Sequence, residues 1–160
     1  MRSKVLNEAP ERTIALILDR GDELMSTLQR FAADHGLTAS RVTAIGAFES
    51  AVLGYFNWDS KAYERIPVNE QVEVLSLVGD IALDGEQPKV HAHVVLGKRD
   101  GSTVGGHLME ATVRPTLELM LVESPAHLRR VCDPVSGIAL IRIEDSGAPA
   151  GGSAGKGAEQ

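Results

Sequence analysis

Short apolar runs rich in β-branched residues recur along this chain, and they constrain its fold more than any other feature of the sequence. Each run is bounded by Gly, Pro or charged residues, a pattern typical of β-strands. We predict strands over residues 12–18, 41–48, 51–58, 71–83, 89–96, 103–109, 117–123 and 137–143. Residues 126–131 are compatible with either a helical turn or an extended segment.

One early segment has helical periodicity instead. Its apolar residues recur three or four positions apart, namely Leu24, Leu28, Phe31 and Ala32. Asp22 stands where a carboxylate can cap free backbone amides, and Gly36 supplies a stop signal. One long helix in the N-terminal half and about seven or eight strands predict an α+β fold.

The length and composition predict a single domain followed by a tail. A chain of 160 residues that is 43% hydrophobic can build one ordinary core. Residues 146–160 are almost entirely Gly, Ala, Ser and Pro, and they contain too little apolar surface to offset the entropy of ordering. We therefore predict a folded domain over residues 11–145 and a disordered tail over residues 146–160.

The charge and cysteine content limit the partners and the compartment. The net charge of -6 repels nucleic-acid phosphates and anionic lipid, and the adjacent basic pairs at 98–99 and 129–130 are interpreted as surface charge. The single cysteine, Cys132, is expected to be a small buried residue, and the aromatic group over 55–58 is expected to pack in the core. With one cysteine, no apolar signal segment and no span of membrane length, the sequence predicts a cytoplasmic protein without a membrane partner.

Two histidines in the predicted strand 89–96 are the strongest chemical signal. His91 and His93 are two positions apart, so they lie on the same face with Cβ atoms roughly 6 to 7 Å apart along the strand. The residues that alternate with them are small or apolar, as expected if the opposite face is core. Two imidazoles at this separation can converge on one metal ion.

Whether His107 joins this pair depends on the register of the hairpin. A two-residue turn over 100–101 would place His107 on the opposite face of the sheet. A three-residue loop over 99–101 would set His107 directly across from His93. Alternatively, the glycines at 105–106 introduce a bulge that corrects the register, or they allow another backbone to approach closely.

Three neutral imidazoles are suited to Zn²⁺ or another first-row divalent ion at about 2.0 to 2.1 Å, with a fourth position left open. In an enzyme, a carboxylate such as Glu73, Glu110 or Glu118 would act as general base towards a bound water. The alternative is a polar cleft in which the histidines only bond to one another and to nearby backbone.

Two families share features with these residues. Gly85, followed after five residues by the His91 and His93 pair, resembles the opening of the cupin motif and implies a metal-binding jelly roll. The cupin glutamate four or five positions later is missing, because this chain has Gly97 and Lys98 there.

The stronger similarity is to the plants-and-prokaryotes-conserved (PPC) domain, and it covers nearly the whole predicted domain. It is carried by residues 21–36, 42–57, 72–82 and 89–121. The resemblance implies an antiparallel sheet and a homotrimer whose subunit clefts hold the segments with His91, His93 and His107. Family members are often labelled DNA-binding, but this chain has no AT-hook core and has acidic residues at 69–73, where plant members carry a basic segment.

Three functions are consistent with these observations. The first is a trimeric regulatory module that associates with DNA only weakly or through a partner. The second is a metal-dependent enzyme of the hydrolase or lyase type. The third is a sensor that binds a small ligand in the histidine cleft without turnover.

Overall fold

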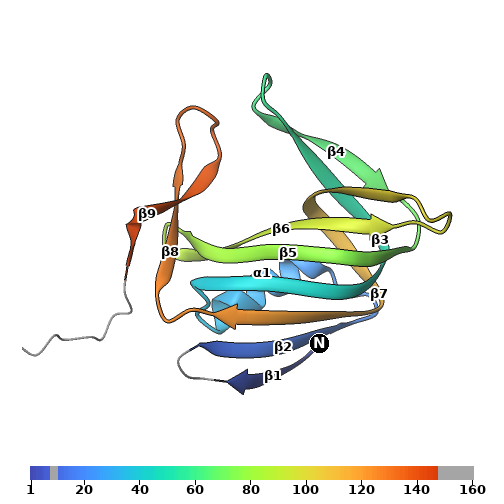
Figure 1. The fold of residues 1–160 in the computed structure, drawn as a ribbon, viewed down its shortest axis with the longest axis horizontal. Helices are drawn as coiled ribbons and strands as arrows, with labels where there is room; N and C mark the ends of the chain where they lie inside the picture. Colours follow the sequence, from blue (N-terminus) through green and yellow to red (C-terminus); the bar gives the residue numbers. More distant parts are fainter. Residues whose placement is uncertain (8–10, 148–160) are drawn as a thin grey trace, which may run out of the picture.

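The computed structural model describes residues 1–7 and 11–147, which form one helix and a nine-stranded sheet (Figure 1). This confirms the predicted α+β fold with a mainly antiparallel sheet. The elements are β1 (Arg2–Asn7), β2 (Arg12–Asp19), α1 (Leu24–Asp34), β3 (Ala39–Asn57), β4 (Ala62–Val68), β5 (Val72–Asp84), β6 (Gln87–Gly97), β7 (Thr103–Glu123), β8 (His127–Cys132) and β9 (Ala139–Gly147). At 11 residues, α1 is an ordinary three-turn helix and not the long one expected.

Two pairs of predicted strands are single long strands. Segments 41–48 and 51–58 belong to β3, and segments 103–109 and 117–123 belong to β7. The breaks expected between them are irregularities in the pairing of β3 with β7, where the register shifts and the strands bend without ending. Pro115 lies in such a shift, between the paired residues Val113 and Leu117, where no ladder hydrogen bond needs its missing N–H.

Two strands were not predicted, namely β1 and β4. The segment 126–131, for which a helical turn and an extended form were both open, is extended as β8. Strand β9 reaches Gly147 and so takes in the first two residues of the predicted tail. The rest of that tail, residues 148–160, lies outside the described residues.

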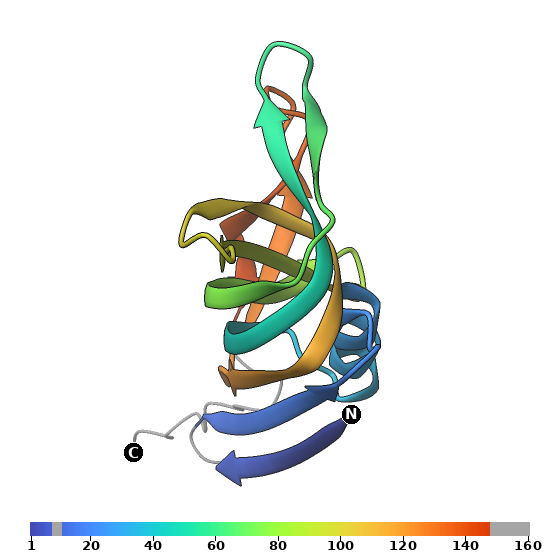
Figure 2. The ribbon, with the colours of Figure 1, turned by 90° about the vertical axis from the view of Figure 1, so that its right-hand side faces the viewer.

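The sheet closes on itself around one end of the core. β3 pairs with β5 and β7, and β6 also pairs with both β5 and β7, so that these four strands form a closed cycle. β2 and β1 continue beyond β7, while β8 and β9 continue beyond β5 through a short parallel pairing (Figure 2). This single continuous sheet differs from the two packed sheets of a cupin-like jelly roll.

Helix α1 packs against β6 and β7 and encloses the core between itself and the inner face of the sheet (Figure 1). Its N-cap is Glu23 and not Asp22, because the Glu23 carboxylate accepts hydrogen bonds from the amides of Met25 and Ser26 at 3.1 and 2.7 Å. The same carboxylate accepts a third bond from the amide of Ala111 at 3.2 Å, which ties the start of α1 to β7. The one helix in the described ranges, α1, is not long and apolar enough to cross a membrane.

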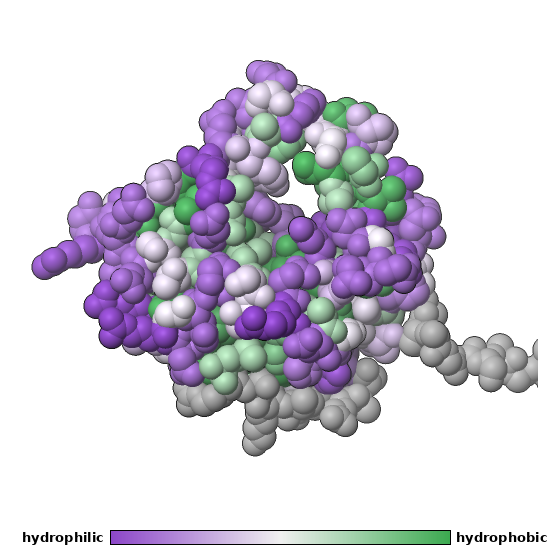
Figure 3. All heavy atoms as spheres, turned by 180° about the vertical axis from the view of Figure 1, so that it is seen from behind, coloured by the Kyte–Doolittle hydropathy of each residue, from purple (hydrophilic) through white to green (hydrophobic). Residues whose placement is uncertain are grey.

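Two hairpins project beyond the body of the sheet as arms. One is formed by β3 and β4, the other by β8 and β9, and a hollow lies between them (Figures 1 and 3). Tyr55 and Trp58 on the first arm are more than half exposed, so the prediction that they pack in the core was wrong. Cys132, expected to be buried, is exposed at the end of β8.

Candidate metal centre

The hairpin between β6 and β7 has the register that brings the three histidines together. The Lys98 amide donates to the Ser102 carbonyl at 2.8 Å, which closes a loop over 99–101, and Gly101 has the positive φ of 84° that this loop needs. His93 is therefore paired directly with His107, with no bulge between β6 and β7. The three-residue loop is confirmed, and the two-residue turn is excluded.

Gly106 does not form a bulge, but it allows the backbone of β3 to approach β7 closely. A Cβ at this position would lie 2.9 Å from the carbonyl oxygen of Gly54, so only glycine lets β3 approach β7 this closely without a shift. His107 is itself paired with Gly54, and the Tyr63 ring of β4 packs on its imidazole with centroids 4.7 Å apart. The close approach thus places His107 between β6 and the first arm.

The three imidazoles form a nearly equilateral triangle. The ring centroids of His91, His93 and His107 are 5.1, 5.1 and 5.3 Å apart, and one nitrogen from each ring lies within 4.8 Å of the other two. The three nitrogens of a tetrahedral ion at about 2.0 to 2.1 Å are separated by about 3.4 Å. The rings therefore need only a small inward rotation to bind one ion.

Burial and mutual repulsion lower the pKa of two of these rings, those of His93 and His107. Burial, together with the charges that His91 and His93 would carry, lowers the pKa of His107 to about 4, and the pKa of His93 is lowered by burial and by His91. Nδ1 of His107 is buried without a hydrogen-bond partner among the described residues. Neutral rings with an uncommitted nitrogen are the form that binds a divalent ion.

Two charged residues, Asp80 and Arg130, adjoin the His91 ring. Asp80 of β5 is paired with His91, and its Oδ2 lies 3.8 Å from Nδ1 of that ring, an ion-pair distance and not a hydrogen bond. The other carboxylate oxygen accepts from Arg130, whose side chain is only 7% exposed and also donates to the Ala139 carbonyl at 3.2 Å. Partial burial raises the pKa of Asp80, but His91 and Arg130 together lower it below its usual value.

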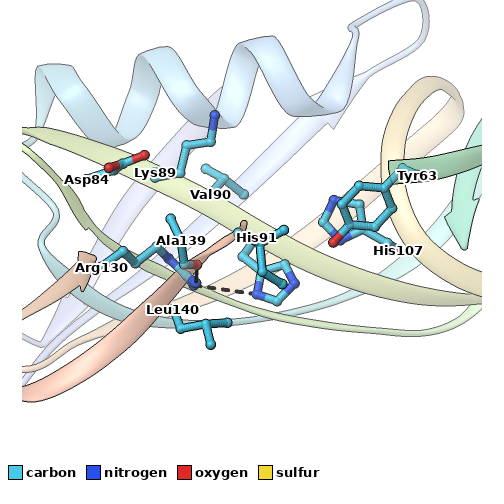
Figure 4. A pocket seen from close by; sticks show the side chains of 10 residues that line it. Tyr63, Asp84, Lys89, Val90, His91, His107, Arg130, Ala139 and Leu140 are labelled. Atoms are coloured by element: carbon cyan, nitrogen blue, oxygen red, sulfur yellow. Dashed lines mark hydrogen bonds between the residues drawn. The ribbon is translucent and has the colours of Figure 1, made fainter. Parts of the chain in front are cut away.

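Asp80 and Arg130 both lie close to Nδ1 of His91. Arg130 lies 3.4 Å from Nδ1 of His91 (Figure 4), and because a guanidinium only donates, this contact uses Nδ1 as an acceptor, whereas Asp80 favours a hydrogen on Nδ1. When Nδ1 carries its hydrogen towards Asp80, Nε2 is left free for a metal ion, as in the carboxylate-supported histidines of metal proteins.

The carboxylates proposed from the sequence as a general base do not join the site. Glu110 forms an ion pair with Arg65 at 2.6 Å, Glu118 is paired with Ile45, and Glu73 is paired with Gly97. None of the three is in the cluster that the described residues form around the histidines. The enzyme hypothesis therefore loses its expected base.

Sequence reasoning missed Asp80, Arg130 and Tyr63. Asp80 had a readable signal, because a two-residue turn at 85–86 pairs Asp84 with Gln87 and so places Asp80 opposite His91. Arg130 was interpreted as surface charge, whereas it is buried against Asp80. Its position depends on the contact of β8 with β5, for which the sequence offers no local signal.

A closed sheet capped by one helix, with histidines gathered on one outer hairpin, defines a small β-rich domain with a candidate metal centre. The chain matches the Plants and Prokaryotes Conserved (PCC) domain, also abbreviated PPC, over residues 6–125, and it belongs to this family.

Several relatives share the fold and part of the sequence. A PPC protein of Pyrococcus horikoshii is 32% identical with a TM-score of 0.77 (82% of this chain, 91% of that chain). A metal-containing protein of Archaeoglobus fulgidus is 33% identical with a TM-score of 0.76 (88% and 96%). A candidate DNA-binding protein of Bacteroides thetaiotaomicron is 25% identical with a TM-score of 0.80 (89% and 98%).

A curated relative, the bifunctional protein GlmU of a Synechococcus strain, is 32% identical over 136 residues. This alignment takes in 83% of the present chain but only 21% of the GlmU chain. The chain thus spans about a fifth of the length of that relative.

Proposed function

We propose that this protein is a metal-binding PPC module that holds one divalent ion, zinc, between His91, His93 and His107. The observation that carries the proposal is the convergence of three imidazoles within 4.8 Å from two strands. A relative of similar length in Archaeoglobus fulgidus is called metal-containing, which supports the same proposal. Three nitrogen ligands favour zinc among the common divalent ions and leave one coordination position open.

The module acts as a homotrimer in this proposal. The outer face of the sheet exposes apolar side chains on four adjacent strands, namely Ile45, Leu75, Val78, Val95 and Met120. We call this set the outer patch. One row across the sheet runs from His93 through Val78 and Thr43 to Met120, so the patch borders the histidines. Burial of a patch of this kind between copies of the chain is a common basis of symmetric assembly.

Its role is regulatory, with DNA contacted weakly or through a partner, and its compartment is the cytoplasm. The candidate DNA-binding relative supports a link to DNA, while the net charge of -6 opposes direct binding to phosphates. We expect little binding of the metal-loaded protein to a fluorescent duplex at about 0.15 M salt, where charges further apart than about 8 Å are screened. Tight binding that weakens steeply with added salt would contradict this part of the proposal.

Metal content tests the centre directly. Protein purified without an affinity tag should contain one zinc per chain by elemental analysis, and a chelator should remove it. Each of His91→Ala, His93→Ala and His107→Ala should reduce metal affinity by orders of magnitude, with little change in far-UV circular dichroism. His35→Ala is the matched control, because His35 at the end of α1 stacks on Phe31 and is not in the cluster.

A metal-dependent hydrolase or lyase is the second candidate. It is supported by the cavity of about 230 Å³ that adjoins His91 and His107. Zinc-dependent turnover in a broad substrate screen, abolished by His93→Ala, would favour this candidate over the regulatory module.

A further inference from the structure

The cavity beside the histidines has a mixed lining that indicates what it binds. His91 and His107 form one end, with the Tyr63 ring packed on His107 (Figure 4). Cationic groups come from Lys89 and Arg130, and the one carboxylate in the lining is that of Asp84. The remaining lining is apolar.

The apolar wall comes from Val90 of β6 and from the second arm. Ile138 is half-buried and Leu140 is 44% exposed, and both line the cavity together with Ala139. The cavity therefore has a charged end next to the histidines and an apolar side along the second arm. A ligand that matches both has an anionic head and an apolar body.

Arg130 is a cation of the lining that has an unused donor, although its guanidinium already donates to Asp80. Its side chain is more than nine-tenths buried, yet its Nε has no hydrogen-bond partner among the described residues. A buried donor of a charged group is costly to leave unpaired, so an acceptor approaching this guanidinium is favoured. A divalent ion at the histidines would add positive charge at the same end of the cavity.

We propose that this cavity binds a short-chain aliphatic carboxylate, with its carboxylate at the open metal position beside Arg130 and its chain against Ile138 and Leu140. The inference rests on the proposed metal centre. The family match ends at residue 125, before β8 begins, so Arg130 and the part of the apolar wall that comes from the second arm lie outside the matched range.

Cobalt-loaded protein provides the test, since Co²⁺ replaces zinc and its visible absorption reports its ligands. Acetate, butyrate, hexanoate and inorganic phosphate are titrated at pH 7, with calorimetry in parallel. Each methylene that enters the apolar wall should strengthen binding about fourfold, so butyrate should bind about 15-fold more tightly than acetate. The cobalt spectrum should change with each carboxylate.

The variant Ile138→Ser should weaken hexanoate binding about tenfold while leaving cobalt and acetate binding unchanged. Ile143→Ser is the matched control, because Ile143 is on the same hairpin but is 70% exposed and does not line the cavity. Thermal midpoints of both variants establish that they are folded.

The outcomes separate this inference from the proposed function. Absence of cobalt binding would overturn both. Three results would overturn the carboxylate pocket and leave the metal centre standing. They are equal affinity of the cobalt-loaded protein for acetate and hexanoate, tighter binding of phosphate than of hexanoate, and a cobalt spectrum that does not respond to carboxylates.

Discussion

Asp80 affects the metal site although it is not in the histidine cluster. Replacing it by Asn keeps an oxygen for Arg130 but removes the negative charge that orients His91. We expect Asp80→Asn to weaken zinc binding about 10- to 100-fold, as is typical for partners that support metal-ligating histidines. Competition with a chromophoric chelator measures this change.

The matched control for Asp80 is Asp84→Asn. Asp84 is exposed at the end of the same strand and is paired with Gln87. Equal zinc affinity of wild type and Asp80→Asn would show that His91 is oriented without the carboxylate.

The lowered pKa of His107 predicts how the metal-free protein responds to acid. In the unfolded chain His107 takes up a proton near its ordinary pKa of 6.5, whereas in the folded chain it stays neutral down to about 4. The unfolded state therefore binds more protons between these values, and the free energy of unfolding falls as pH decreases from about 6.5 towards 4. His107 contributes at most about 1.4 kcal/mol per pH unit, and His93 acts in the same direction.

Urea unfolding of chelator-treated protein at pH 7, 6 and 5 measures this slope. His107→Gln removes the titrating group, so its stability should depend less on pH than that of the wild type over the same window. Parallel curves for the two proteins would mean that His107 is not held neutral by the fold.

At the scale of elements, Gln29 connects the helix to the strand that carries two of the histidines. Its side chain accepts from the Val90 amide at 3.1 Å and donates to the Pro88 carbonyl. Pro88 and Val90 are buried and Gln29 is half-buried, so these bonds are partly shielded from water. We expect Gln29→Leu to lower the free energy of unfolding by about 1–3 kcal/mol, because it leaves a backbone donor unpaired.

Arg30→Met is the control for this substitution, since Arg30 is exposed on the same helix and should change stability by less than about 0.5 kcal/mol. Chemical unfolding of both variants gives the comparison. If Gln29→Leu were as stable as Arg30→Met, α1 would be held on β6 by apolar packing alone.

At the scale of the whole molecule, the outer patch determines the assembly in our proposal. Val78 is 54% exposed at the centre of the patch, and a lysine there would have to be desolvated in an interface between chains. We expect wild-type protein to have three times the 17.1 kDa chain mass in light scattering at micromolar concentration, and Val78→Lys to be a monomer.

Val135→Lys controls for the added charge, because Val135 is 67% exposed on the second arm, away from the patch. A wild-type protein that is monomeric, or a Val78→Lys variant that stays trimeric, would contradict the proposed interface. Zinc titration of each variant then shows whether assembly affects the neighbouring histidines.

Local patterns in the sequence were sufficient for the helix, for most strands and for the shared face of His91 and His93, while the place of His107 stayed open between alternative turns. Strand alternation places His91 and His93 together, and the loop over 99–101 sets His107 opposite His93, because both depend only on residues near one another in the chain. The turn at 85–86 also fixes the place of Asp80, although that signal was not used.

Only the tertiary structure decided the rest of the site. Pairing between β3 and β7 joins segments that are far apart in sequence, and β7 continues through Pro115 because the register shift there leaves no ladder hydrogen bond that needs its missing N–H. Arg130 reaches Asp80 only because β8 runs beside β5. The sequence therefore determined which residues share a face of the sheet, while burial between distant segments determined which strands became neighbours and what surrounds the histidines.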